Sequence, residues 1–85
     1  RWGGEEFLVI LPNIAEEVLN AVAERCRRLI EESVTKYDGQ DIRVTVSIGA
    51  VIASPEETAE ACLERADRLM YLSKANGRNR VTSES

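Results

Sequence analysis

The hydrophobic residues of this 85-residue chain change their spacing from one segment to the next, and this change most strongly limits its fold. Residues 7–11 form a continuous apolar run, FLVIL, which predicts a strand buried on both faces. Apolar residues then recur at helical spacing over residues 14–32, alternate with polar residues over 42–48, and return to helical spacing over 59–73. This order predicts an α/β or α+β domain in which amphipathic helices pack on a sheet.

Both predicted helices carry capping residues at their expected ends. Asn13 should cap the first helix, with Glu16 as the second half of a capping box. Ser54 should cap the second helix, with Pro55 at its first position. Asn76-Gly77 should end that helix, because glycine accepts the left-handed conformation common at helix C-termini.

The remaining local signals define turns and the limits of the domain. Asp38-Gly39 marks a turn, and Gly49 indicates a bulge or a close approach of backbone. Residues 80–81 are expected to add a short strand. We expect residues 1–81 to form one domain and 82–85 a polar tail, and we expect the chain to be part of a longer protein, because it does not start with Met.

Composition excludes several classes of function. The chain has no histidine, which removes Ser-His-Asp chemistry and histidine-ligated zinc. Its net charge of -4 argues against bulk nucleic-acid binding, and no apolar run approaches the ~20 residues of a membrane helix. Cys26 and Cys62 lie among apolar residues without a Cys-x-x-Cys pair, so we expect reduced core thiols in a cytoplasmic protein.

The charge is unevenly distributed. Residues 64–80 contain five basic and two acidic side chains, whereas the rest of the chain contains six basic and 13 acidic ones. A cationic segment on an acidic protein suggests a local anion site, although a solvated helix face has the same composition.

Gly3-Gly4-Glu5-Glu6 is the first candidate site. Two glycines at a hairpin turn would let a phosphate approach the backbone, and Glu5 and Glu6 would supply hard oxygen ligands for Mg²⁺. An ordinary hairpin with two solvated glutamates remains the alternative at this point.

Lys74 and Arg78 form the second candidate site. They are four residues apart at the end of the second predicted helix, so they would project together if the helix or its terminal turn extends to Arg78. Such a pair could bind two phosphates, but the helix dipole also favours cations at this end without any ligand.

Four segments resemble the GGDEF domain of diguanylate cyclases. The first, R-W-G-G-E-E-F at Arg1–Phe7, resembles the signature R-x-G-G-[DE]-E-F, with Glu in place of Asp at the third signature position. The others are V-T-V-S-I-G at Val44–Gly49, A-D-R-L-M-Y-L-S-K at Ala66–Lys74 and G-R-N-R-V at Gly77–Val81. The resemblance covers nearly the whole chain, but only the C-terminal half of such a domain.

The resemblance implies a role for each matching residue. Gly3 and Gly4 would contact GTP, Glu5 and Glu6 would be catalytic and hold Mg²⁺ or Mn²⁺, and Lys74 and Arg78 would bind the β- and γ-phosphates. It also implies a ferredoxin-like, nucleotidyl-cyclase-like palm whose sheet contains antiparallel strands. In this chain the first, central strand of that sheet would be missing, which should leave an unpaired gap.

The implied activity is condensation of two GTP molecules into cyclic di-GMP and two pyrophosphates, by a homodimer in the bacterial cytoplasm. We expect this chain alone to be inactive, because the missing half normally supplies a metal ligand and the guanine-reading residues. The alternatives are a degenerate GGDEF module that binds GTP or dimerises to regulate an attached domain, and an α/β adaptor without a ligand.

Overall fold

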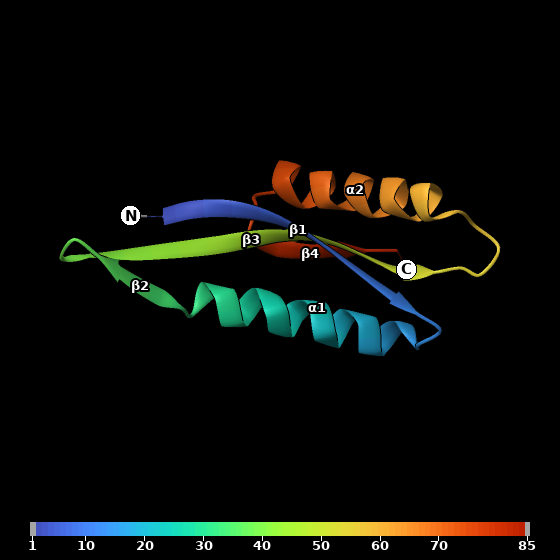
Figure 1. Cartoon of the computed structure of the whole chain (residues 1–85), viewed down its shortest axis with the longest axis horizontal. Coiled ribbons are helices and arrows are strands. Elements are labelled where there is room, and N and C mark those ends of the chain that lie inside the picture. The colour runs from blue at the N-terminus through green and yellow to red at the C-terminus, as the bar shows by residue number, and fades with distance from the viewer. Residues whose placement is uncertain (1, 85) are drawn as a thin grey trace.

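A four-stranded sheet lies between two helices (Figure 1). The computed structural model describes residues 2–84. The elements in chain order are β1 (Trp2–Pro12), α1 (Glu16–Glu31), β2 (Val34–Tyr37), β3 (Gln40–Ala53), α2 (Ala59–Ala75) and β4 (Arg80–Ser83). Strand β3 is central: β1 pairs along one of its edges, while β2 and β4 share the other. The predicted α/β class, with a sheet containing antiparallel strands, is confirmed.

Strands β1 and β3 pair directly and in parallel along their whole common length. The register runs from Trp2 opposite Arg43 to Pro12 opposite Ala53. The expectation of an unpaired gap in the sheet was therefore wrong for this chain. Pairing the two strands satisfies the backbone N–H and C=O groups of both, which would otherwise lack partners on that side.

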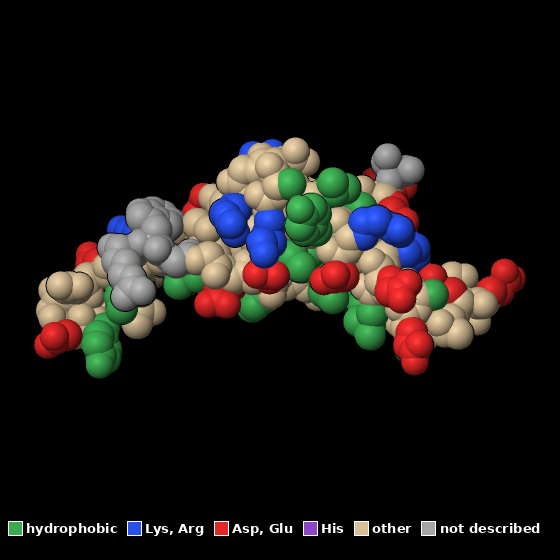
Figure 2. All heavy atoms as spheres, turned by 90° about the horizontal axis from the view of Figure 1, so that it is seen from above, with side chains coloured by type: hydrophobic (Ala, Val, Ile, Leu, Met, Phe, Trp, Pro, Cys, Tyr) green, Lys and Arg blue, Asp and Glu red, His purple; other side chains and the backbone are tan. Residues whose placement is uncertain are grey.

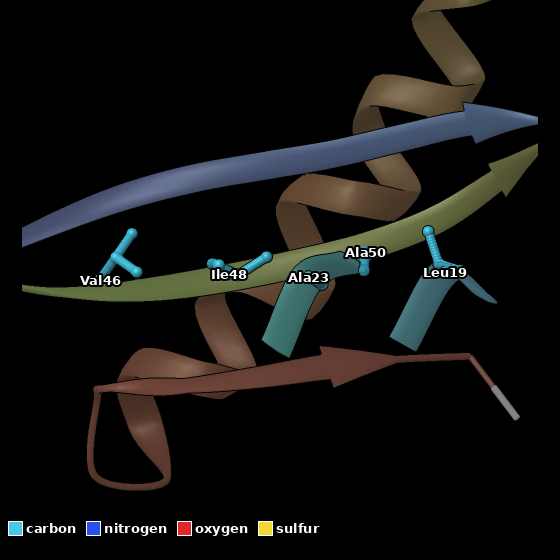
Figure 3. Close-up of a cluster of buried hydrophobic side chains, with 5 residues drawn as sticks. All are labelled: Leu19, Ala23, Val46, Ile48 and Ala50. Atoms are coloured by element: carbon cyan, nitrogen blue, oxygen red, sulfur yellow. The ribbon is translucent and has the colours of Figure 1, made fainter. Parts of the chain in front are cut away.

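Helix α1 covers one face of the sheet through two fully buried side chains. Leu19 and Ala23 pack against the apolar residues of β3 that alternate toward this face, namely Val46, Ile48 and Ala50 (Figure 3). Complete burial of one Leu side chain contributes about 2 kcal/mol, so this contact fixes the α1 face of the core.

Helix α2 covers the opposite face. Cys62 and Ala66 pack on Val51 of β3, whose side chain points away from the α1 core. A methyl group placed on Gly49 would lie 2.0 Å from the backbone oxygen of Ala66. The prediction of a close backbone approach at Gly49 is thus confirmed, with the α2 backbone resting directly on β3. Both cysteines are free, as expected.

The N-terminal capping residues predicted for both helices were wrong, whereas Asn76-Gly77 ends α2 as predicted. Helix α1 begins after Ala15, which provides no side-chain cap, while Asn13 takes a left-handed φ of 48° in the preceding turn. The Ser54 N–H does donate to the Glu57 carboxylate, and the Ser54 hydroxyl accepts from the Glu56 N–H, but these hydrogen bonds close a separate turn. The N-cap of α2 is Thr58, whose hydroxyl accepts from the Ala61 N–H at 3.1 Å.

The turn at Asp38-Gly39 joins β2 to β3, and β2 itself was not predicted. Both turn residues have positive φ, 53° and 77°, as a tight two-residue hairpin requires. The expected last strand is present as β4, which extends two residues into the segment 82–85 predicted as a tail; Ser85 lies outside the described residues.

Candidate functional site

The predicted signature segment lies inside β1 rather than at a hairpin turn. Residues 3–6 pair in parallel with residues 44–47 of β3, and the φ of Gly4 is not in the left-handed region. The expected hairpin geometry was therefore wrong for the described part of the chain. A Cβ placed on Gly4 would meet nothing within 4 Å, so the fold itself does not require glycine there. The open space beside this backbone is available to a ligand.

Glu6 and Lys74 meet although 68 residues separate them in the sequence. The Nζ of Lys74, in the last turn of α2, donates to the Oε2 of Glu6 on β1 at 3.0 Å. Figure 2, which looks onto the α2 side, shows Lys and Arg side chains next to acidic ones near the middle of this face. The Glu6 side chain is half exposed, and exposed ion pairs stabilise folds by less than about 1 kcal/mol. The contact therefore adds little stability, but it places the carboxylate of Glu6 on β1 beside the ammonium group of Lys74 on α2.

Glu5 projects to the opposite face of the sheet from Glu6, because successive side chains of a strand alternate. Its exposed carboxylate forms no hydrogen bond or ion pair within residues 2–84. Glu5 and Glu6 are carboxylate donors of the type that Mg²⁺ prefers, yet no group of three possible metal-ligating side chains occurs among the described residues. The donor type fits a magnesium ion, but the ligand set is incomplete and needs oxygens from elsewhere, such as substrate phosphates and water.

Arg78 is not in helical geometry and does not share a helix face with Lys74, but the terminal turn of α2 extends to it. Helix α2 ends at Ala75, and the backbone N–H of Arg78 donates to the carbonyl of Ser73 at 2.8 Å. The N–H of Gly77 donates to the carbonyl of Lys74 at 3.5 Å, which completes a Schellman C-cap. Arg78 itself has a φ of 63°, and its exposed guanidinium has no partner in the described part of the chain.

Asn79 is a residue whose importance the sequence pattern did not reveal. Its side-chain oxygen accepts from the Nη1 of Arg27 at 2.9 Å, and its amide nitrogen donates to Glu31 at 2.5 Å. The hydrogen bond from Asn79 is the main cause that lowers the pKa of Glu31 below its ordinary value, and Arg27 adds to it. Arg27 and Glu31 are four residues apart on α1 and form an ion pair, but nothing local indicated their contact with residue 79, about fifty positions away.

A second group of ion pairs lies away from the signature strand, around Arg65. Its guanidinium donates to Glu57 and to the carbonyl of Ile52, and it also pairs with Glu84. Hydrogen bonds from Arg65 and from the Ser54 N–H hold the pKa of Glu57 below its ordinary value. These contacts link the turn before α2 to strand β3, so we assign Arg65 a role in stabilising the fold.

Neither helix within residues 2–84 combines the length and apolarity needed to cross a membrane.

Comparison with known proteins gives one consistent result. A family model described as "Diguanylate cyclase, GGDEF domain" matches residues 1–80. Diguanylate cyclase A of Treponema denticola is 51% identical over 83 residues, which are 96% of this chain and 22% of that protein. The response regulator PleD of Caulobacter vibrioides is 42% identical over 88 residues, covering 100% of this chain and 19% of PleD. The chain thus spans about a fifth of the length of these relatives.

A solved structure agrees with the sequence matches. The GGDEF domain of DgcB from Caulobacter crescentus, in complex with c-di-GMP, superposes with a TM-score of 0.76 at 36% identity. The match covers 85% of this chain and 43% of that one. The fold described above therefore corresponds to less than half of a solved GGDEF domain.

Proposed function

Because the chain belongs to the GGDEF family of diguanylate cyclases, we propose that it forms the phosphate-binding part of an enzyme that condenses two GTP molecules into cyclic di-GMP and two pyrophosphates. The observation that carries this proposal is the 3.0 Å contact between Glu6 and Lys74. It joins the signature strand to the basic C-terminal end of α2, which are distant in sequence. An acidic group for a metal and a basic group for phosphate thereby share one face of the sheet.

The two cations have complementary roles in this proposal. Lys74 is a compact charge with three donors, and Arg78 presents a planar fork that matches phosphate oxygens. Without nucleotide, Lys74 is neutralised by Glu6, whereas Arg78 has no partner among residues 2–84. A triphosphate would thus bind Arg78 directly and replace Glu6 as the partner of Lys74.

Gly3 and Gly4 would let the nucleotide approach the strand. No atom lies within 4 Å of a Cβ built on Gly4, so a phosphate or ribose can contact the backbone there. A side chain at Gly4 would fill that space without disturbing the fold. Glycine is therefore favoured there by ligand binding and not by folding.

Glu5 and Glu6 would provide carboxylate ligands for Mg²⁺ or Mn²⁺. Because their side chains lie on opposite faces of β1, each would hold an ion on its own face, with phosphate and water oxygens completing the ligand set. When bound, such an ion neutralises phosphate charge and lowers the pKa of a coordinated hydroxyl. The residues of this chain then have one task in the chemistry, which is to hold the triphosphate so that pyrophosphate can leave as the new ester bond forms.

Each cyclisation needs two such domains. The 3′-hydroxyl of each GTP attacks the α-phosphorus of the other, the bond from that phosphorus to the leaving pyrophosphate breaks, and the hydroxyl proton is lost. A homodimer that brings two sites face to face meets this requirement. Since the matched relatives are bacterial proteins and GTP is a cytoplasmic substrate, we expect this homodimer to work in the bacterial cytoplasm.

The proposal is tested in a graft, in which this chain replaces the matching 83-residue segment of diguanylate cyclase A from Treponema denticola. The graft should produce cyclic di-GMP from GTP and Mg²⁺, and Lys74→Met should raise the KM for GTP by at least about tenfold, the usual effect of losing a charged phosphate contact. Lys36→Met is the matched control, because it removes a Lys–carboxylate pair with Asp41 at the hairpin between β2 and β3.

The outcomes separate the proposal from its alternatives. Product formation that Lys74→Met weakens and Lys36→Met does not would support the cyclase. Mg²⁺-dependent GTP binding without product would favour the degenerate, regulatory module. A graft that neither binds GTP nor forms product would contradict the proposed function.

A further inference from the structure

The backbone of Arg78 is held on both sides, while its side chain has no hydrogen bond or ion pair with any of residues 2–84. Its N–H donates to the Ser73 carbonyl at 2.8 Å, and its own carbonyl accepts from the Nε of Arg80 at 3.2 Å. Its φ of 63° lies in the left-handed region, which is unfavourable for a residue with a long side chain. Such a conformation persists only where surrounding contacts impose it.

Asn79 supplies the contacts that follow Arg78 in the chain. It is half-buried, has a left-handed φ of 47°, and is bound on both polar atoms of its side chain by Arg27 and Glu31 of α1. Arg27 is in turn held by Glu24 at 2.6 Å and by Glu31 at 3.3 Å, with only 15% of its side chain exposed. We call Arg27, Glu31 and Asn79 the α1 clamp.

The α1 clamp joins the two faces of the sheet. Lys74 lies on the α2 face, whereas Arg27 and Glu31 belong to the helix on the opposite face (Figure 1). The three residues 77–79, all with positive φ, carry the chain from the end of α2 to β4. Arg78 is therefore fixed between the Schellman cap of α2 on one side and the α1 clamp on the other.

We propose that Arg27, Glu31 and Asn79 are positioning residues that act through Arg78, holding its backbone in the left-handed conformation that presents the guanidinium to the nucleotide phosphates. This inference rests on the proposed function for the identity of the ligand. Its structural part, that the clamp fixes the backbone of Arg78, is independent of any ligand. The lowered pKa of Glu31 is consistent with it, because the charged carboxylate is the form that the clamp binds.

The structural part is tested by hydrogen exchange of the Arg78 amide in this chain without nucleotide. Arg27→Met keeps an apolar stem but removes the guanidinium, and should make that amide exchange about tenfold faster relative to the core of β3, the factor expected from losing one hydrogen bond to a charged group. Glu31→Gln keeps an oxygen acceptor for Asn79 and should change exchange less than Arg27→Met does.

Arg65→Met is the matched control. Arg65 is also half-buried and also pairs with two carboxylates, but it lies in the N-terminal half of α2, away from Arg78. In Arg65→Met, the exchange rate of the Arg78 amide relative to the core of β3 should equal that of wild type. An Arg78 amide that is unaffected by Arg27→Met, or that accelerates equally in Arg65→Met, would overturn the proposed clamp.

The functional part is tested in the graft with a non-hydrolysable GTP analogue and Mg²⁺. Arg27→Met should weaken binding about tenfold, and should weaken it no further once Arg78→Ala is present, because residues that act through one group are not additive. Independent, multiplicative losses would contradict the inference. If the unsubstituted graft does not bind the analogue, the proposed function fails, while the exchange experiment still decides whether the clamp fixes Arg78.

Discussion

Substitution of Gly49 by alanine provides a sharp test of how α2 is placed. Gly49 lies in β3 between Leu8 of β1 and Thr82 of β4, so the strand is paired on both edges at this point. A Cβ there would lie 2.0 Å from the Ala66 oxygen and 2.4 Å from the Met70 nitrogen. Both are backbone atoms of α2, so no side-chain rotation relieves the overlap.

The magnitude follows from the distance that must be gained. Non-bonded contacts of this kind need about 3 Å or more, so the α2 backbone must retreat by about 1 Å from the sheet. Overpacking of cores costs about 1–3 kcal/mol, and overlap with two backbone atoms of α2 places Gly49→Ala at about 3 kcal/mol. For a domain of this size, that corresponds to a fall in Tm of about 12–24 °C.

The assay is urea unfolding of the chain, followed by far-UV circular dichroism. Gly4→Ala is the control, because nothing lies within 4 Å of its Cβ and its φ is ordinary; its free energy of unfolding should stay within about 0.5 kcal/mol of wild type. If Gly49→Ala were as stable as Gly4→Ala, the close packing of α2 on β3 would be refuted.

The other predictions concern Ser73, Glu57 and the chain as a whole. Ser73→Ala should lower the free energy of unfolding by about 1–2 kcal/mol in the same urea assay, because the buried hydroxyl bonds the Ile48 carbonyl at 2.8 Å and the Thr82 hydroxyl at 2.7 Å. The pKa of Glu57 is lowered from 4.5, so its stabilising contribution is present above pH 4.5 and disappears as the pH falls through the lower folded-state value. The urea midpoint of wild type should therefore fall more steeply between pH 5 and 3 than that of Glu57→Gln, and parallel curves would contradict this sign. The chain alone should form no cyclic di-GMP from GTP and Mg²⁺; chromatographic detection of product would contradict the expected inactivity.

The spacing of the hydrophobic residues located most of the fold, although β3 is covered on both faces and its residues 46–51 are all buried. Val46, Ile48 and Ala50 all point to the same core, and the helical stripe of α1 faces it. Strand β2 was missed because all four of its residues are exposed, so it has no burial pattern. The Asp38-Gly39 turn was the one signal that could have revealed it, since two residues with positive φ favour a hairpin.

Helix starts were less predictable, because capping side chains also stabilise turns. Ser54 forms the hydrogen bonds expected of a cap, yet the turn that it closes ends at Glu57, and Thr58 begins α2 instead. Both interpretations satisfy local hydrogen bonding, and the ion pair of Glu57 with Arg65 favours the separate turn.

The candidate site needed the structure because its contacts are long-range. Resemblance to the GGDEF family selected Glu6 and Lys74, but their 3.0 Å contact depends on how β1 and α2 pack. Local spacing suggested that Lys74 and Arg78 share a helix face, and the Schellman cap at Gly77 instead turns the chain before Arg78. The contact of Asn79 with α1 has no local signal at all.

The most direct test of the proposed function is cyclic di-GMP formation by the graft beside its Glu5→Ala variant, with GTP and Mg²⁺ in excess. The account predicts product from the unsubstituted graft and a loss of at least about a hundredfold in Glu5→Ala, the scale expected when a group that stabilises a phosphoryl-transfer transition state is removed. Equal product from both would remove Glu5 from the site, and no product from a folded, dimeric graft would contradict the assignment of this chain to a working cyclase.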